Sequence, residues 1–416
     1  MAFLHSVAYA SSRRARWHSR SSKTVVMLGL LTGCGASERP SAASASIDTL
    51  PGGIVRVSNL SPADSGRWSL VLERTVQPAD ESAGALRNPD DILLLDDGSL
   101  IVSDTKPASV MRFDPSGHFG GTIGREGGGP GEYRSAYVAA HGDTLVIHDP
   151  TAARATMFSL TNNAVQTQRA TPPRYYSTIR IDGSGRVVTP TLSDDDSVRG
   201  PRQGYLRFSL NGATVDTAMI PERKEGDRRW IVRDAKRIIF ETLVPFQPRD
   251  IHTPDPLGGF VTGWSGEYAL RTTRNGADTV RVIRRMRSNE PVNNTEKAAM
   301  VEAKVAEMKS FTSEALLRSG MVASAIPDTR PSFDQIAVDP AGRIWVRLSQ
   351  RDSTTVRFDL FDHDGRWLDT ITVPQAGWNR DWWHPVSYTR DRVAVIHEDE
   401  GGKPAILVYK IVRRDK

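Results

Sequence analysis

Residues 90–123, DDILLLDDGSLIVSDTKPASVMRFDPSGHFGGTI, decide the fold of this 416-residue chain. They contain runs of strand-forming residues at 91–95, 100–104, 109–113 and 119–123. Gly98 lies in the turn between the first two runs and Gly117 in the turn between the last two. Glycine tolerates the positive φ that tight hairpin turns require. This unit therefore predicts four short antiparallel strands that are joined by hairpins.

The same layout recurs along the rest of the chain. Further copies lie at about residues 137–163, 182–212, 255–276, 334–365 and 386–412. The sixth copy ends after three strands, whereas residues 68–73 form a strongly alternating strand upstream of the first copy. A ring of four-stranded sheets closes well when an N-terminal strand completes the last sheet. The sequence thus predicts an all-β, six-bladed β-propeller closed by its N-terminal strand; a decorated β-sandwich is the alternative.

A glycine-rich loop, GREGGGPGEY at residues 124–133, separates the first two copies. It resembles the inter-blade loop of NHL-type propellers and is similar to that of a group of bacterial six-bladed propeller lipoproteins. In that family such a loop precedes a new blade, and the second strand often ends in V-x-D, as Val102-Ser103-Asp104 does here. The resemblance covers the layout of about 90–410 but the motif of only about 88–134. It implies an exported propeller.

The N-terminus has the composition of an export signal. A basic segment precedes the apolar run VVMLGLL at 25–31, and the only cysteine of the chain, Cys34, follows in LTGC. These four residues resemble the bacterial lipobox, which implies that Cys34 is acylated and attaches the protein to a membrane. We expect a lipoprotein signal peptide at 1–33, a flexible tether at 34–52 and the propeller at 53–416. For the location of the anchored protein, the outer membrane or the periplasmic face of the membrane is favoured. An ordinary or twin-arginine signal, or a buried thiol, is the alternative.

Charge argues against nucleic acid as a partner. The chain holds 54 Lys and Arg against 49 Asp and Glu, and residues 1–33 hold five of the basic residues and no acidic ones. The remainder is therefore formally neutral. Nucleic-acid binding requires a concentrated positive face.

Two insertions interrupt the repeat. The first, 222–249, is heavily charged, and it predicts either a solvated face or a site for an acidic partner. The second, 291–320, predicts one α-helix at about 295–319, with Asn293 or Asn294 as its cap. Val301, Val305 and Met308 form an apolar stripe on this helix. Such a helix covers one face of the ring, where it either shields the central channel or covers an apolar patch.

No strong catalytic motif is present in the sequence. The glycine-rich loop lacks the Lys-Ser/Thr ending of a phosphate loop, and neither a G-x-S-x-G nor an H-E-x-x-H pattern occurs. The better candidates come from propeller geometry, because the innermost strands line a central channel. The predicted channel residues are Asp91, Arg180, His252, Asp334 and His384. Related six-bladed lactonases hold a divalent cation there, so a metal-dependent hydrolase or lactonase is one hypothesis. The other interpretation is that these five residues are ordinary polar residues in a water-filled channel or in turns.

Three tryptophans precede the last copy, namely Trp378, Trp382 and Trp383. Exposed, they would form an aromatic platform for a glycan or a peptide. Buried, they would seal the junction between blades five and six.

Our leading hypothesis is an exported, lipid-anchored propeller without catalysis. It acts as a ligand-binding or protein-interaction scaffold in the cell envelope, with a small molecule, a glycan or an envelope protein as partner. The hydrolase and a glycan-binding surface protein are the alternatives.

Overall fold

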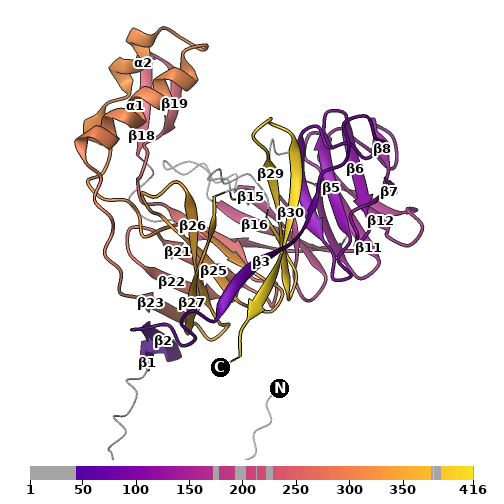
Figure 1. The fold of residues 1–416 in the computed structure, drawn as a ribbon, viewed down its shortest axis with the longest axis horizontal. Helices are drawn as coiled ribbons and strands as arrows, with labels where there is room; N and C mark the ends of the chain where they lie inside the picture. Colours follow the sequence, from indigo (N-terminus) through magenta and orange to yellow (C-terminus); the bar gives the residue numbers. More distant parts are fainter. Residues whose placement is uncertain are drawn as a thin grey trace, which may run out of the picture. The chain divides into compact units, whose positions relative to one another are not determined.

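The computed structural model describes residues 44–171, 178–192, 203–211, 213–221, 228–375, 378 and 386–415. Within these ranges, six antiparallel sheets follow one another along the chain and form the blades of a six-bladed β-propeller (Figure 1). The prediction of an all-β, six-bladed fold is confirmed. Cys34, Trp382, Trp383 and His384 lie outside the described residues.

The blades contain the following strands, given from the centre of the ring outward. Blade 1 has β4 (Pro89–Leu94), β5 (Leu100–Thr105), β6 (Ala108–Phe113) and β7 (Phe119–Thr122), and blade 2 has β10 (Tyr137–His141), β11 (Thr144–Asp149), β12 (Arg154–Ser159) and β13 (Val165–Ala170). Blade 3 has β14 (Arg180–Ile181), β15 (Arg186–Leu192), β16 (Gln203–Ser209) and β17 (Thr214–Met219), and blade 4 has β20 (Asp250–Pro254), β21 (Phe260–Trp264), β22 (Ala269–Thr273) and β23 (Thr279–Arg285). Blade 5 has β24 (Phe333–Val338), β25 (Ile344–Leu348), β26 (Thr355–Phe361) and β27 (Trp367–Pro374), and blade 6 has β28 (Val386–Tyr388), β29 (Arg392–Glu398), β30 (Pro404–Arg413) and β3 (Trp68–Val76).

The N-terminal strand β3 closes the ring. It pairs antiparallel with β30 as the fourth strand of blade 6, with Trp68 opposite Arg413 and Val76 opposite Ile406. The two ends of the propeller chain therefore meet in one sheet (Figure 1). The predicted closing strand is confirmed, and the pairing covers a sheet edge that would otherwise be open to other chains.

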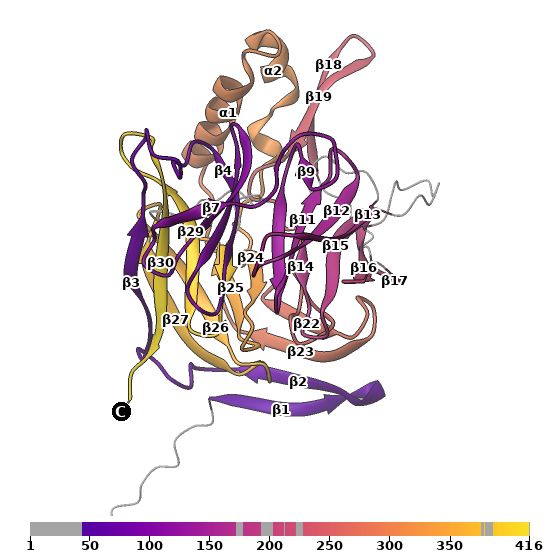
Figure 2. The ribbon, with the colours of Figure 1, turned by 90° about the vertical axis from the view of Figure 1, so that its right-hand side faces the viewer.

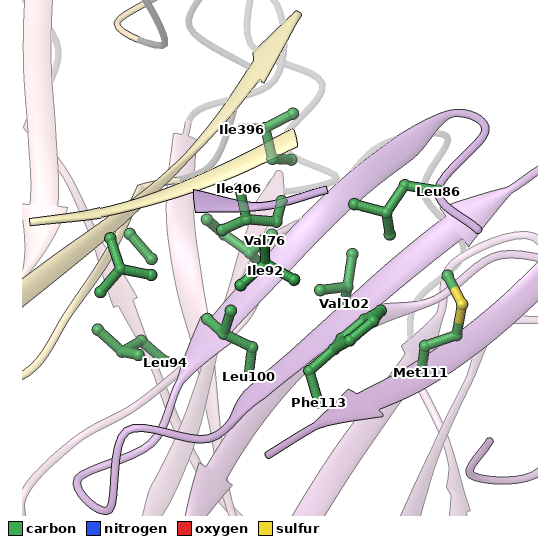
Figure 3. Packing of buried hydrophobic residues seen from close by; sticks show 12 residues of the cluster. Val76, Leu86, Ile92, Leu94, Leu100, Val102, Met111, Phe113, Ile396 and Ile406 are labelled. Carbon is green, nitrogen blue, oxygen red and sulfur yellow. The ribbon is translucent and has the colours of Figure 1, made fainter. Parts of the chain in front are cut away.

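The hydrophobic core is divided among the six junctions between neighbouring blades. Each junction has its own cluster of buried side chains. At the closing junction, Val76 from β3 and Ile406 from β30 pack with Ile92, Leu100 and Phe113 of blade 1 (Figure 3). Alternation along each strand sends one set of side chains to each side of the sheet, so every blade can contact both of its neighbours.

A repeated aspartate turn connects many of the strands. Between β14 and β15, the Asp182 carboxylate accepts backbone hydrogen bonds from Ser184 and Arg186, both at 3.0 Å. Between β24 and β25, the Asp339 carboxylate accepts the same pair of bonds from Ala341 at 2.9 Å and Arg343 at 3.0 Å. Glycine follows three residues after each aspartate with a positive φ, which explains the hairpin spacing in the sequence.

The predicted tether at 34–52 is wrong at its C-terminal end. β1 (Ala45–Leu50) pairs antiparallel with β2 (Ile54–Asn59) across a short 3₁₀ turn at Pro51–Gly53. β2 then pairs parallel with β23, so that the sheet of blade 4 has six strands. The Asn59 side chain also ties β2 to blade 5, because it donates to the Gly365 carbonyl at 3.0 Å and accepts from the Trp367 amide at 2.7 Å.

The two insertions pack together as one structure, which we call the insertion lobe (229–243 and 294–326). The charged insertion at 222–249 contains the hairpin of β18 (Arg229–Asp234) and β19 (Arg237–Leu243). Trp230 and Val232 of this hairpin are buried against Val301, Val305 and Leu317 of the helical insertion. In both views the lobe and the β1–β2 hairpin lie at opposite ends of the propeller (Figures 1 and 2).

The prediction of a single helix at 295–319 is wrong, because the segment forms two. α1 (Asn294–Met308) is capped by Asn293, whose side chain accepts from the Glu296 amide, and the predicted cap is confirmed. α2 (Glu314–Gly320) has its own cap, since the Ser313 side chain accepts from the Leu316 amide. Among the described residues, neither helix is long and apolar enough to cross a membrane.

Candidate functional site

Asp91 joins two blades and does not serve as an open channel ligand. It is fully buried on β4, and its carboxylate accepts hydrogen bonds from the Val138 amide of blade 2 at 2.8 Å and the Ile92 amide at 3.0 Å. Burial raises the pKa of Asp91 to about 7, against the opposing effect of the Arg180 guanidinium. Asp91 therefore has a structural role, and its pKa lies well above the usual value for an aspartate.

His252 also turns away from the channel. Its Nδ1 lies 2.8 Å from the Tyr205 hydroxyl, and its Nε2 lies 2.8 Å from Oε1 of Gln203. Both partners belong to β16 in blade 3, so His252 joins blades 3 and 4. Desolvation by burial lowers the pKa of His252 to about 4, which keeps the imidazole neutral. Neither ring nitrogen is open to a metal ion in this arrangement.

Arg180 and Asp334 open onto different spaces. Arg180 lines a channel cavity of about 160 Å³, which is bounded by the inner strands β14, β20, β24 and β28. Asp334 lines a second cavity and accepts a hydrogen bond from Nε of Arg347 at 2.5 Å. The neighbouring residue Gln335 lines the channel cavity, because successive side chains of a strand point to opposite sides.

The structure does not gather the described channel candidates into a metal site. Asp91 and His252 are each occupied by hydrogen bonds between blades, and Arg180 and Asp334 face separate cavities. In the part of the chain that the structure describes, no group of three His, Cys, Asp or Glu side chains could hold a metal ion. The fifth candidate, His384, lies outside that part.

The glycine-rich loop has a structural role. Tyr133 is buried, and its hydroxyl donates to the Ile123 carbonyl and accepts from the Val110 amide, each at 2.8 Å. Gly124 has φ +66°, and a Cβ there would lie 2.7 Å from the Gly131 carbonyl oxygen. The loop therefore needs glycine for its close backbone approach.

The aspartate of the V-x-D pattern organises the start of its blade. Asp104 accepts backbone hydrogen bonds from Arg87 at 2.6 Å and Asn88 at 3.0 Å, just before β4. Asp149 repeats this contact in blade 2, where it accepts from the Arg134 amide at 2.8 Å. The shared motif thus reflects blade construction and not ligand binding.

Trp378 seals a blade junction. It is buried, with its ring centroid 4.9 Å from that of Phe358 on β26 and 6.0 Å from that of Tyr409 on β30. The prediction that Trp378 belongs to an exposed aromatic platform is therefore wrong. The alternative, that it seals the junction between blades 5 and 6, is confirmed for this residue. The prediction for Trp382 and Trp383 falls outside the described residues.

The larger cavity was not predicted from the sequence. It has a volume of about 280 Å³ and lies between the base of the insertion lobe and blades 4 and 5. We call it the blade 4–5 cavity. Its polar lining consists of Gln247, Arg249, Ser265, Arg330, Asp334, Arg347, Ser349, Gln350, Thr355 and Gln375. The apolar part of its wall includes Phe246 and Phe333.

Positive charge exceeds negative charge in this cavity. Arg347 is paired with Asp334, and Arg330 is paired with Glu296 at 2.5 Å. The third guanidinium, that of half-buried Arg249, forms no hydrogen bond or ion pair with any described residue, while its backbone amide donates to Oγ of Ser265 at 2.8 Å. Among the described residues, Arg249 is therefore the arginine of the cavity wall that has no acidic partner.

Two acceptors in the wall also lack partners. The Gln350 amide nitrogen donates to the Thr355 carbonyl at 2.8 Å, and that of Gln375 donates to the Trp378 carbonyl at 2.6 Å. Within the described residues, the Oε1 atoms of both glutamines are buried without a hydrogen-bond partner. An unpaired buried acceptor costs about 1–3 kcal/mol, so the two glutamine oxygens are a local energetic cost beside the cavity wall.

The chain at the cavity wall is strained at Phe246. This residue has φ +58°, in the left-handed region that bulky side chains avoid. Its ring lies 4.1 Å from the Arg330 guanidinium carbon, and Gln247 beside it holds the base of the hairpin through the backbone of Arg228. Such strain costs about 1–3 kcal/mol and occurs preferentially at ligand sites.

Comparison with known proteins leaves the family of this chain open. No family model matches the sequence, and no curated protein matches it. Among solved structures, a protein of Bacteroides fragilis NCTC 9343 that is inferred to be exported has 12% identity and a TM-score of 0.47, over 86% of this chain and 100% of that chain. A member of the DUF4221 family from Bacteroides vulgatus ATCC 8482 has 9% identity and a TM-score of 0.47, over 84% and 100%. A β-propeller domain from Myceliophteria thermophila has 8% identity and a TM-score of 0.36, over 82% and 100%.

Proposed function

We propose that this protein is an exported, lipid-anchored propeller that binds a small organic acid in the cell envelope. The observation that supports it most strongly is the blade 4–5 cavity, whose wall contains Arg249, with no ion pair to any described residue, beside polar side chains such as those of Gln350 and Thr355. Ligand pockets are concave, largely preformed and carry a few convergent polar groups.

The polar groups of the cavity define the ligand class. A carboxylate suits Arg249, because a guanidinium binds planar anions through two parallel hydrogen bonds. The polar side chains of the wall, such as those of Ser349, Gln350 and Thr355, suit hydroxyl or amino groups on the same molecule. The volume of about 280 Å³ is at the lower end of ligand pockets and suits a molecule the size of a sugar acid or an amino acid.

Binding to this cavity is tested with matched small molecules. We expect galacturonate, gluconate or glutamate to bind at least about tenfold more tightly than neutral galactose or donor-free hexanoate, because a hydrogen bond to a charged group contributes about 1.5–3 kcal/mol. Arg249→Ala should weaken this binding by about 10- to 100-fold in isothermal titration calorimetry. Arg357→Ala is the control, since Arg357 is an exposed residue of β26 outside the cavity. Failure of all three acids to bind, or equal binding by Arg249→Ala, would contradict the proposal.

The lipid anchor is a separate part of the proposal. The basic segment, the apolar run and the LTGC sequence that ends at Cys34 support it. We expect Cys34→Ser to release the protein from membranes, because a thioether-linked lipid can form only on the cysteine. Fractionation of membranes and measurement of the intact mass test this, and membrane association of the serine variant at the wild-type level would argue against the anchor.

A further inference from the structure

The β18–β19 hairpin exposes three large aliphatic side chains to solvent. Its inner face is buried, since Trp230 and Val232 pack into the core of the insertion lobe. On the outside, Ile231, Ile238 and Ile239 are 36%, 46% and 43% exposed. Three large aliphatic side chains on one short hairpin are unusual for a solvent-facing surface, and such clusters often mark interaction sites.

Basic residues surround these isoleucines. The hairpin and the residue before it carry Arg228, Arg229, Arg233, Lys236 and Arg237, against the acidic Asp234 and Glu241. Only Arg229 has an acidic partner among the described residues, Glu241 at 3.0 Å. The surface therefore has a positive excess, which lies next to the exposed apolar side chains.

One edge of the hairpin is open to a further strand. β18 and β19 form a two-stranded sheet, and no other described strand pairs with either of them. The edge of β18 is approached by α2, where a Cβ on Gly320 would lie 2.5 Å from the Ile231 carbonyl oxygen. The edge of β19 is the one that remains for a partner. Edge strands with unpaired amides and carbonyls accept an extended segment of another chain.

We propose that the β18–β19 hairpin binds an extended acidic segment of a partner protein, which pairs with β19 as an added strand. Because successive side chains of β19 point to opposite faces, the acidic side chains of the added strand face Arg237 on one side of the sheet, and its alternate apolar side chains contact Ile238 on the other. Charge complementarity selects an acidic partner, since like charges across an interface cost several kcal/mol.

The position of the hairpin favours a protein over a lipid surface. The insertion lobe and the β1–β2 hairpin lie at opposite ends of the propeller in both views (Figures 1 and 2). Ten residues, 35–44, link Cys34 to β1, and ten residues span at most about 35 Å. With the proposed anchor on Cys34, the β1–β2 end is held near the membrane and the hairpin at the other end is presented to proteins.

Peptide binding to the full mature chain tests this inference. The probe is a fluorescent peptide that alternates glutamate and valine, compared with a lysine–valine peptide and with a glutamate–valine peptide that is N-methylated at alternate residues. We expect binding of the first peptide only, because the second has the wrong charge and the third cannot form the strand hydrogen bonds. The variants Arg233→Glu/Arg237→Glu and Ile238→Ser/Ile239→Ser should each weaken binding at least about tenfold.

Matched substitutions of exposed residues outside the hairpin provide the controls. Arg366→Glu and Ile47→Ser alter exposed residues outside the hairpin and should leave peptide binding unchanged. Organic-acid binding by the hairpin variants shows that they are folded, and it is independent of the docking result. Three outcomes overturn the inference: no binding of the glutamate–valine peptide, binding that survives the hairpin substitutions, or hairpin-dependent binding of phosphatidylglycerol vesicles in place of the peptide.

Discussion

Replacement of Val76 by aspartate is expected to destabilise the protein by about 4 kcal/mol or more, the largest effect that we predict for a single substitution. Val76 is the last residue of the closing strand β3 and is only 3% exposed. It lies opposite Ile406 and packs in the cluster between blades 6 and 1 with Ile92 and Phe113 (Figure 3). An aspartate there either places a charge among apolar side chains or takes up a proton, and both reduce the stability of the closed ring.

Val71→Asp on the same strand is the matched control. Val71 is 49% exposed, so a carboxylate at this position stays in water and should change the free energy of unfolding by less than about 1 kcal/mol. Urea unfolding monitored by tryptophan fluorescence measures both variants. Equal stabilities of the two variants would mean that β3 does not close the ring through its buried face.

Asp91→Asn is expected to produce the second large effect, a change in the pH dependence of stability. The pKa of Asp91 is raised from 3.8 to about 7 by burial, so the folded protein keeps a proton that the unfolded chain releases across this range. The contribution of Asp91 to stability is thus present at low pH and lost as the pH rises through about 7. The difference in pKa corresponds to about 4 kcal/mol.

The effect is visible in the difference between variant and wild type. His252 acts in the opposite direction, because its pKa is lowered to about 4 and its stabilising contribution is lost as the pH falls from 6.5 towards that value. The two effects partly cancel in the wild-type curve. We expect the free energy of unfolding of Asp91→Asn, relative to wild type, to rise by about 4 kcal/mol between pH 4 and pH 7.

Exposed Asp96, in the next turn, supplies the control for this experiment. Asp96→Asn also removes one carboxylate, that of an exposed side chain, and it is measured over the same pH series. A difference between Asp91→Asn and wild type that stays constant with pH would show that the buried carboxylate does not hold a proton in the folded state.

The blades could be predicted from the sequence because their signals are local. Each hairpin is specified by an aspartate and a glycine a few residues apart, such as Asp339 and Gly342, and by alternation along the flanking strands. The closing strand was also predictable, because one unpaired strand precedes the first blade and one strand is missing from the last.

Features that depend on contacts distant in sequence were not predictable. The parallel pairing of β2 with β23 joins residues more than two hundred positions apart, so residues 45–52 read as part of a tether. The break between α1 and α2 is set by the Ser313 cap, while the apolar pattern continues across it.

The candidate site could not be predicted from the sequence for the same reason. The positions of Asp91 and His252 on inner strands suggested a common channel, but their side chains turn towards neighbouring blades and form hydrogen bonds there. The blade 4–5 cavity is lined by residues of blades 4 and 5 and by Leu243 at the base of the insertion lobe, and it brings Arg249 and Gln350 to one space from separate blades. No local motif marks either residue in the sequence.

A crystal of the mature protein soaked with galacturonate tests the proposed binding site most directly. We predict continuous difference density in the blade 4–5 cavity, with carboxylate oxygens about 2.7–3.2 Å from the Arg249 guanidinium. An unchanged cavity, or density confined to the channel beside Arg180, would contradict the proposed ligand site.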